Sequence, residues 1–291
     1  MQEKAYAKIN LCLDIIDKRK DGYHNLDTVM QTVDLYDTLT INVLETKNRS
    51  ICITTNDKSL PTDHNNLVYK AVDLFLSLAR MENDVQIHLE KNIPVAAGLG
   101  GGSSDAACVL NSLNKLTGVN IKKELLCEES KKIGADIPFA LFGGTARVKG
   151  IGELIDPIYL KENIWLVLIC PNISVSTKVV FQKFIFDRIS SPEKTENVVK
   201  ALSEGDNKLL GANLFNRLES VTIKDHPVIG EIKSKIIDTG AFGAVMSGSG
   251  PSVFGIYADK QTAIKAHCKL NDIYRDTCWS RYLRTMKGSC L

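Results

Sequence analysis

The sequence predicts an α+β protein with two lobes. Strand-like alternation fills most of the first 55 residues, helical segments are grouped between blocks of strands, and the strand pattern restarts around residues 157–163. Helices that are grouped in this way, with antiparallel blocks of strands, are typical of α+β folds. We therefore expect an N-terminal domain at residues 1–157 and a C-terminal domain at residues 158–291.

The composition fits a globular protein and excludes several functional classes. With 44% hydrophobic and 24% charged residues, the 291-residue chain can bury a core. A net charge of +2 is too small to indicate binding to nucleic acid or to a membrane surface. The chain contains no uncharged apolar stretch long enough for a transmembrane helix, and its first residues lack a signal-peptide core. We expect a cytoplasmic protein.

The eight cysteines are scattered along the chain without the spacing of a zinc site or a CxxC pair. We interpret them as reduced thiols that serve mainly in packing. No metal ligand is predicted among them.

The first half of the chain reads as a sheet followed by helices. Residues 5–16 alternate between apolar and polar types, which predicts a half-buried strand, and Asp21-Gly22 marks a turn after it. Residues 32–45 and 50–55 predict further strands, so we expect an antiparallel sheet. A helix is predicted at residues 65–80 with Asn65 or Asn66 as its N-cap, and a short strand at 84–90. Helices at about 103–116 and 122–134 follow, the second closed by Gly134.

The second half of the chain also contains predicted strands and helices. Residues 145–158 predict a hairpin, and residues 164–170 predict a buried strand. Helices dominate up to about residue 238. Residues 243–257 read as a strand, a glycine-serine loop and a strand, before a helix from about residue 260 and a final strand near 279–286.

The segment "PVAAGLGGGSS" at residues 94–104 has the features of an anion site. A glycine-rich turn that runs into a helix presents backbone N–H groups and the positive end of the helix dipole. Ser103 and Ser104 could cap this helix, bind phosphate oxygens or hold a metal ion. The segment is neither a Walker A motif nor a G-x-G-x-x-G fingerprint. A tight loop without a ligand is the alternative.

Polar residues elsewhere form two further candidate sets. Lys8 and Asn10 lie two apart on the polar face of the first strand, and the following turn can bring Tyr23 and His24 to the same sheet. Asp136 in "GADIPF" could act as a proton acceptor beside a lysine, or as an N-cap. The second glycine-serine loop, "MSGSGPS" at residues 246–252, could be only a hairpin turn, and it does not fit a G-x-S-x-G nucleophile elbow.

Taken in order, these motifs resemble the GHMP small-molecule kinases. The resemblance is carried by "AKINLCLDI", "KRKDGYHNLDTVMQTVDLYD", "PVAAGLGGGSSDAA", "GADIPFALFGGTARVKGIGE" and "GAVMSGSGPSVF", which cover residues 5 to about 257. "AKINL" with "DGYH" and "GADIPF" is narrower. It resembles the branch that phosphorylates a cytidine diphosphate-linked methylerythritol in the isoprenoid pathway that does not use mevalonate.

The resemblance implies a two-lobed fold with the active site in the cleft between the lobes. It implies ATP and Mg²⁺ as cofactors, Asp136 as the general base and Lys8 as the residue that contacts the reacting hydroxyl. It also implies substrate binding by Asn10, Tyr23, His24, Thr177 and Phe181. The ATP phosphates would lie along the glycine-rich segment, which comprises Pro94, Val95, Ala96, Ala97, Gly98, Leu99, Gly100, Gly101, Gly102, Ser103 and Ser104.

The resemblance leaves some features open. Asn65 to Val68, Lys91 and Pro94 are expected near the adenine. The residue after the two serines, here Asp105, varies among relatives. We expect a small-molecule substrate, no nucleic acid or membrane partner, and a monomer or homodimer. Another GHMP kinase acting on a nucleotide-free alcohol, or a non-catalytic sensor that binds nucleotide, are the alternatives.

Overall fold

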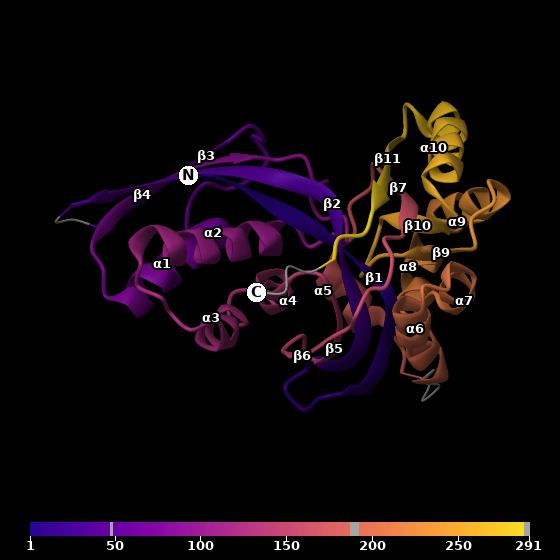
Figure 1. Ribbon diagram of the computed structural model, residues 1–291, viewed down its shortest axis with the longest axis horizontal. Coiled ribbons are helices and arrows are strands. Elements are labelled where there is room, and N and C mark those ends of the chain that lie inside the picture. The colour runs from indigo at the N-terminus through magenta and orange to yellow at the C-terminus, as the bar shows by residue number, and fades with distance from the viewer. Residues whose placement is uncertain (47–48, 187–191, 288–291) are drawn as a thin grey trace. The chain divides into compact units, whose positions relative to one another are not determined.

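A computed structural model of the chain describes residues 1–46, 49–186 and 192–287. The chain forms two compact units whose segments are interleaved along the sequence (Figure 1). The first unit comprises Met1–Ala7, Leu35–Val95 and Gly100–Phe142. The second comprises Lys8–Asp34, Ala96–Leu99 and Gly143–Leu291. The expected division into domains at residues 1–157 and 158–291 stays a prediction.

Two long strands run through both units. These are β1 (Gln2–Lys18) and β2 (His24–Glu45), joined by a tight turn in which the Arg19 N–H donates to the Tyr23 carbonyl at 2.8 Å. Gly22 has a φ of +89° in this turn, which a residue with a side chain rarely adopts. The predicted strand at residues 5–16 and the turn at Asp21-Gly22 are therefore confirmed.

In the first unit, strands and helices form two layers. Strands β3 (Ser50–Thr55) and β4 (Asn83–Glu90) extend the sheet in the order β3-β4-β2-β1. Helices α1 (Leu67–Ala79) and α2 (Gly101–Thr117) pack against each other on one face of these strands (Figure 1). The shorter helices α3 (Lys123–Ser130) and α4 (Ile137–Phe142) complete the helical layer.

The core of the first unit follows from the apolar periodicity of these elements. Phe75 and Leu76 of α1 are buried against Leu39 of β2 and Val85 of β4. Asn66 caps α1 by accepting the Val68 N–H at 2.8 Å, as the sequence predicts. At about 25 cal/mol per Å² of apolar area, such side chains contribute about 1.5–3 kcal/mol each to the free energy of folding.

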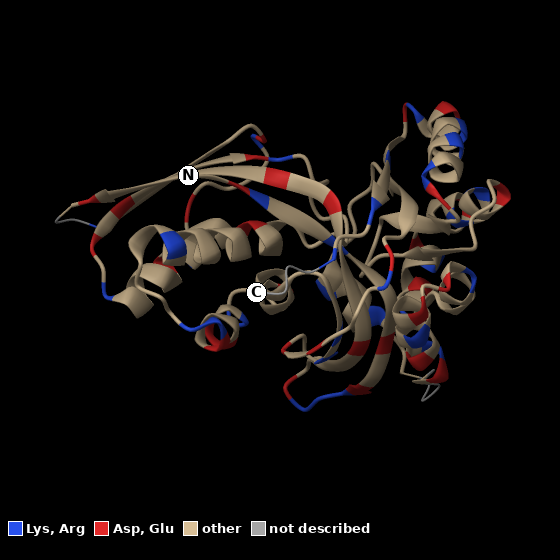
Figure 2. Cartoon of the chain, in the orientation of Figure 1, with Lys and Arg blue, Asp and Glu red and all other residues tan. Residues whose placement is uncertain are grey.

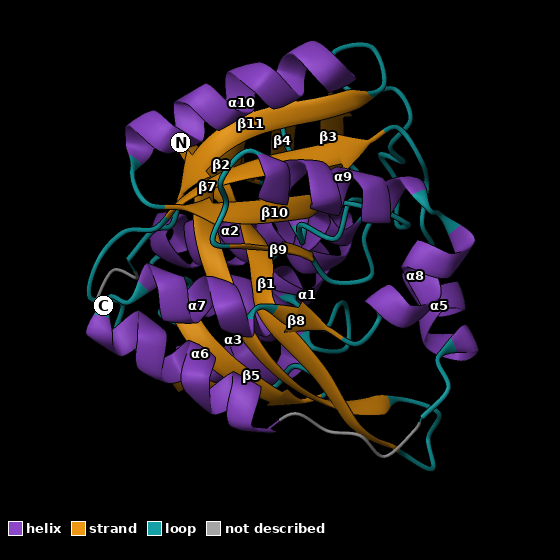
Figure 3. Cartoon of the chain, turned by 90° about the vertical axis from the view of Figure 1, so that its right-hand side faces the viewer, coloured by secondary structure: helices purple, strands orange, loops and turns teal. Residues whose placement is uncertain are grey.

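In the second unit, a four-stranded antiparallel sheet has the order β11-β7-β10-β9. Its strands are β7 (Trp165–Pro171), β9 (Gly243–Met246), β10 (Val253–Tyr257) and β11 (Cys278–Arg284). Helices α9 (Val228–Asp238) and α10 (Lys260–Tyr274) pack against it (Figure 3). Val167, Ile169, Ile236, Val253 and Ala263 form part of the core between these layers.

The second unit also contains a hairpin, a short strand and four further helices. A hairpin of β5 (Thr145–Gly150) and β6 (Leu154–Pro157) pairs with β2, and the short strand β8 (Phe215–Asn216) pairs in parallel with β1 at Cys12 and Leu13. The other helices are α5 (Thr177–Lys183), α6 (Pro192–Glu204), α7 (Asn207–Asn213) and α8 (Glu219–Asp225).

Three local expectations were wrong. Strand β3 does not form an antiparallel pair with β2, because β4 lies between them and pairs with β3 in parallel. Helix α3 ends at Ser130 and residues 131–133 form turns, so the helix does not extend to Gly134 as predicted. Helix α2 begins at Gly101 with Gly100 as its cap, so neither Ser103 nor Ser104 caps it.

Charges of both signs are interspersed along the elements of each unit (Figure 2). Every cysteine within the described ranges is a free thiol. Among the helices that the structure describes, none combines the length and apolar character needed to cross a bilayer.

Candidate active site

The glycine-rich segment (residues 94–104) has the backbone of an anion site. Ala96, Gly98 and Gly100 have φ values of +53°, +75° and +67°, so every second residue is left-handed. Alternation of this kind turns successive N–H groups toward one side, as in anion-binding nests. Gly100, the cap of α2, has no side chain that could accept from the first helical turn. The first N–H groups of α2 and the positive end of its dipole are therefore available to a phosphate.

The tip of this segment packs tightly on the serine-glycine loop (residues 246–252), and both lie in the second unit. The Ser247 hydroxyl donates to the Gly98 carbonyl at 2.9 Å, and the Ser252 N–H donates to the Ala97 carbonyl at 3.4 Å. A Cβ atom on Gly98 would lie 2.2 Å from the Ser247 carbonyl oxygen. Only glycine allows this approach of two backbones.

Replacing Gly98 by alanine should destabilise the protein by about 3–5 kcal/mol, because a methyl group would collide with backbone while the φ is also unfavourable. The expected result is a lower denaturation midpoint in urea. Gly118 is the matched control, since its φ is +67° but a Cβ there meets no atom within 4 Å. Gly118→Ala should cost only about 1–2 kcal/mol. Equal losses for the two variants would show that the contact with Ser247 is unimportant.

Lys8 and Asn10 lie together on the buried polar face of β1. The Lys8 side chain is 6% exposed, and its Nζ donates to Asn10 Oδ1 at 2.8 Å. Asn10 Nδ2 donates to the Thr28 hydroxyl at 2.9 Å, and the Asn10 N–H donates to Ser247 Oγ at 3.3 Å. The backbone N–H of Lys8 donates to the Leu99 carbonyl at 3.0 Å. This network joins the predicted Lys8 and Asn10 to the tip of the glycine-rich segment.

His24 and Phe181, predicted as substrate-binding residues, form an aromatic cluster. Their ring centroids are 5.5 Å apart with an interplanar angle of 35°, and Phe184 meets the His24 ring edge at 6.4 Å. Burial, and then the charge of Lys18, lower the pKa of His24. A neutral imidazole carries one donor and one acceptor, which suits recognition of a base edge.

The structure places two other predicted substrate residues near this region of the second unit. Tyr23 directly precedes His24 and its side chain is 62% exposed. Thr177 begins α5, and its hydroxyl lies 2.8 Å from the Ser249 hydroxyl of the serine-glycine loop. Four residues later on the same helix, Phe181 reaches His24. The spacing from Thr177 to Phe181 thus corresponds to one turn of helix.

Asp136 belongs to the first unit, unlike Lys8. It lies at the start of α4, where its carbonyl accepts the Ala140 N–H at 3.0 Å. Its side chain is half-buried. Ile137, Phe139 and Leu141 after it are buried, so the short helix is anchored in the core and holds the carboxylate in place.

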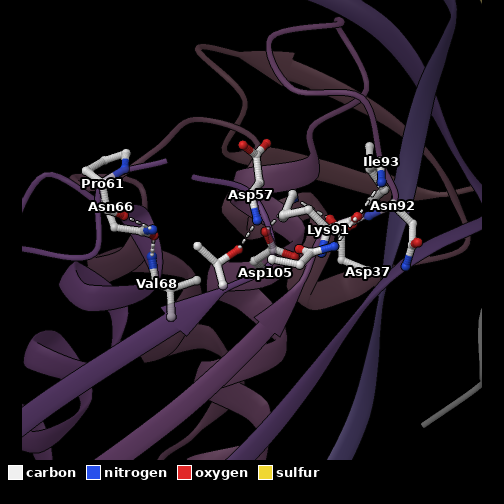
Figure 4. Close-up of polar contacts among 11 residues, drawn as sticks. Asp37, Asp57, Pro61, Asn66, Val68, Lys91, Asn92, Ile93 and Asp105 are labelled. Atoms are coloured by element: carbon white, nitrogen blue, oxygen red, sulfur yellow. Dashed lines mark hydrogen bonds and ion pairs between the residues drawn. The ribbon is translucent and has the colours of Figure 1, made fainter. Parts of the chain in front are cut away.

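Two sets of contacts in these regions were not predicted. The serine-glycine loop contacts Asn10 and Gly98, although its sequence alone was compatible with a simple hairpin turn. Lys91 lies in a buried triad with Asp37 and Asp105 (Figure 4). Lys91 was expected near the adenine, Asp105 follows the two serines, and Asp37 ends the motif "KRKDGYHNLDTVMQTVDLYD", but no pattern in the sequence showed that these three side chains meet.

Comparison with known proteins identifies the family of both halves. Residues 66–144 match the family described as "GHMP kinases N terminal domain", and residues 198–276 match "GHMP kinases C terminal". The chain is 42% identical over 277 residues to the 4-diphosphocytidyl-2-C-methyl-D-erythritol kinase of Alkaliphilus metalliredigens. That alignment covers 95% of this chain and 94% of the relative.

Solved structures of kinases superpose on this chain over almost its whole length. A crystal structure of 4-(cytidine 5'-diphospho)-2C-methyl-D-erythritol kinase superposes with a TM-score of 0.81 at 31% identity, covering 99% of this chain and 100% of that one. A homoserine kinase from Cytophaga hutchinsonii superposes with a TM-score of 0.78, covering 99% of this chain and 95% of that one. At 19% identity, the second likeness shows the fold alone.

Proposed function

We propose that this chain, which belongs to the GHMP kinase family, phosphorylates the 2-hydroxyl of 4-diphosphocytidyl-2-C-methyl-D-erythritol. This compound is called the cytidyl substrate below. The products are the 2-phosphate and ADP, within the isoprenoid precursor pathway that does not use mevalonate. The observation that carries this choice of substrate is the 42% identity, across 95% of the chain, to a kinase of that name. The buried Lys8–Asn10 pair and the His24–Phe181 cluster support it.

ATP is the phosphoryl donor, as the kinase family implies. Its phosphates would bind along the glycine-rich segment, where left-handed residues and the uncapped start of α2 supply N–H donors. Phosphoryl transfer needs mainly positioning and charge neutralisation, which backbone amides and a helix dipole provide. The proposed ATP contacts are those of residues 94–104.

Mg²⁺ would enter with the nucleotide. Within the described parts of the chain no group of three or more His, Cys, Asp or Glu side chains forms a metal site. Mg²⁺ at phosphates is usually held largely by phosphate oxygens and water, with one or two carboxylates at most. When bound, the ion would help neutralise the phosphate charge.

Asp136 and Lys8 have the proposed catalytic roles. A tertiary hydroxyl is a weak acid, so a carboxylate that accepts its proton late in the reaction lowers the barrier. Asp136 is the proposed base. An ammonium group stabilises negative charge that develops on the attacking oxygen, and Lys8 is proposed to supply it. Asn10 holds the Lys8 ammonium at 2.8 Å and would orient it.

His24 and Phe181 are proposed to hold the cytosine, with Tyr23 and Thr177 beside them. Replacing His24 by alanine should raise the KM for the cytidyl substrate about 5- to 150-fold, because stacking on a base is worth about 1–3 kcal/mol. The kcat should stay near the wild-type value, since His24 does not contact the reacting atoms. Steady-state kinetics with saturating ATP measures both constants.

His267 offers a control for the same substitution. It is half-buried in the second unit and its Nε2 lies 3.2 Å from the Ser280 hydroxyl, outside the His24 cluster. His267→Ala should leave the KM unchanged. A His24→Ala variant with a normal KM and a low kcat would contradict the binding role.

A coupled ADP-release assay tests the proposed function. It compares the cytidyl substrate with mevalonate and homoserine in the presence of ATP and Mg²⁺. Turnover on the cytidyl substrate alone supports the proposal. Turnover on mevalonate or homoserine would keep the chemistry but overturn the assignments of Tyr23, His24, Thr177 and Phe181. Binding of ATP without turnover on any alcohol would favour a sensor.

A further inference from the structure

The buried triad (Asp37, Lys91 and Asp105) brings together three charged side chains in the interior of the first unit. Lys91 Nζ donates to Asp105 Oδ2 at 2.8 Å and also to Asp37 Oδ2, so the ammonium lies between two carboxylates (Figure 4). The side chains are 6%, 0% and 2% exposed for Lys91, Asp37 and Asp105. Charges are rarely buried to this degree unless they are paired.

The triad connects three separate parts of the chain. Asp37 lies on β2, Lys91 directly follows β4, and Asp105 lies in the first half of α2. Asp37 Oδ1 also accepts the backbone N–H groups of Asn92 and Ile93, at 2.5 and 2.8 Å. The chain is therefore fixed to β2 immediately before Pro94, where the glycine-rich segment begins.

The same triad reaches the other end of that segment. Asp105 follows Ser104 directly, and a Cβ atom on Gly101 would lie 3.3 Å from Lys91 Nζ. The ammonium thus lies against the backbone of the first turn of α2. Asp105 Oδ1 is buried without a hydrogen-bond partner, so the carboxylate is held through Lys91 and is not fully satisfied by it.

We propose that Asp105 is a positioning residue for nucleotide binding: through Lys91 and Asp37, its carboxyl group fixes the separation between the two ends of the glycine-rich segment. This inference rests on the proposed ATP site in that segment. The segment turns through left-handed residues at 96, 98 and 100, so its N–H groups converge only if its ends are held at the right distance. Asp105 itself is buried and acts through the backbone rather than by contacting the phosphates.

Substitution at Asp105 should weaken ATP binding more than it slows catalysis. Asp105→Ala removes one side of the Lys91 bridge, and we expect the Kd for ATP, measured by titration calorimetry, to rise about 10- to 100-fold. The kcat at saturating ATP should change far less, because Asp136 and Lys8 are untouched. Asp105→Asn keeps an oxygen that can accept from Lys91 and should restore most of the affinity.

Ser112→Ala is the matched control. Ser112 is a buried polar residue on the same helix, and its hydroxyl lies 4.0 Å from Cys108 Sγ. Its loss should leave the Kd unchanged. A normal Kd in Asp105→Ala, an equal fall in kcat and affinity, or the same defect in Ser112→Ala would overturn the positioning role.

The calorimetric series separates this inference from the proposed function. If the wild-type protein binds ATP but does not turn over the cytidyl substrate, the proposed substrate is wrong and the Kd series still decides the role of Asp105. If the wild-type protein does not bind ATP at all, both are overturned. Should the alanine variant fail to fold, the pH dependence of ATP affinity, compared between the wild-type protein and Asp105→Asn, keeps the test valid.

The pH dependence of ATP affinity gives an independent readout. Burial, opposed by Lys91 and reinforced by Asp37, raises the pKa of Asp105 to about 7. The two carboxylates outweigh burial and raise the pKa of Lys91, which therefore stays charged. Other groups facing the triad are Asp57, whose pKa is lowered mainly by hydrogen bonds from Ser59 and also by the charge of Lys91, and the Cys108 thiol on α2, whose pKa burial raises to about 12.

The sign follows from these charges. Above about pH 7 Asp105 loses its proton, and two carboxylates beside one ammonium leave a net negative charge next to the end of α2. Between about pH 6.5 and 8.5, the Kd of the wild-type protein for ATP should rise about 3- to 10-fold relative to Asp105→Asn, which cannot ionise. Parallel pH profiles for the two proteins would contradict the assignment.

Discussion

Replacement of Asp136 by asparagine is expected to lower kcat about 10²- to 10⁴-fold, the usual contribution of a general base. Asparagine has nearly the same shape, so α4 should keep its buried anchors Ile137, Phe139 and Leu141. The amide cannot accept a proton from the attacking hydroxyl. The KM values for ATP and the cytidyl substrate should therefore change little, and the loss should appear in kcat.

Asp206 provides the same substitution in a comparable local setting. It directly precedes α7 and caps it, accepting the N–H groups of Lys208 and Leu209 at 3.0 and 2.9 Å. Asparagine is an equally good N-cap, so Asp206→Asn should have wild-type kinetics and stability. Wild-type kcat in Asp136→Asn would remove Asp136 from the role of base.

Replacement of Lys8 by methionine should also lower kcat by about 10²- to 10⁴-fold. Methionine preserves the apolar stem in the buried site but removes the charge that would stabilise the developing alkoxide. It also leaves Asn10 Oδ1 without the donor that the structure shows at 2.8 Å. A thermal melt beside the kinetics is needed, because an unsatisfied buried acceptor costs about 1–3 kcal/mol of stability.

Lys4→Met is the control for Lys8. Lys4 lies on the same strand but is exposed, with Nζ 4.1 Å from the centroid of the Tyr36 ring. Removing this charge should leave kcat within about twofold of the wild-type value, since exposed interactions of this kind are worth about 0.5–1 kcal/mol. If Lys8→Met lowers only the melting temperature, Lys8 has a structural role and not a catalytic one.

Local sequence patterns predicted most of the elements because their causes are local. Alternation at residues 5–16 became β1, and Asn66 caps α1. The pairing of β3 could not be predicted in this way. Residues 50–55 follow β2 after a short connection, which favours a hairpin, yet β4 inserts between the two strands and pairs with both. Strand order depends on packing of distant segments, which no local pattern encodes.

In the candidate site too, local features were predictable from the sequence and contacts between distant segments were not. The turn of the glycine-rich segment was predictable from its glycines, although the close approach to Ser247 that requires glycine at Gly98 is visible only in the structure. The pairing of His24 with Phe181 came from the family resemblance, because the two residues are far apart in sequence. The triad of Asp37, Lys91 and Asp105 was not predicted, since a buried charge is indistinguishable from a solvated one in the sequence.

Because the segments of the two compact units are interleaved along the chain, some strands are synthesised long before the strands they pair with. Cys12 of β1 pairs with Phe215 of β8, which the ribosome adds 203 residues later (215 − 12). At about 5–20 residues per second, this edge of β1 waits about 10 to 40 s for its partner. An open strand edge invites pairing with other chains. The β1–β2 pairing covers only the opposite edge of β1, so the edge that pairs with β8 stays open until nearly three quarters of the chain has been synthesised.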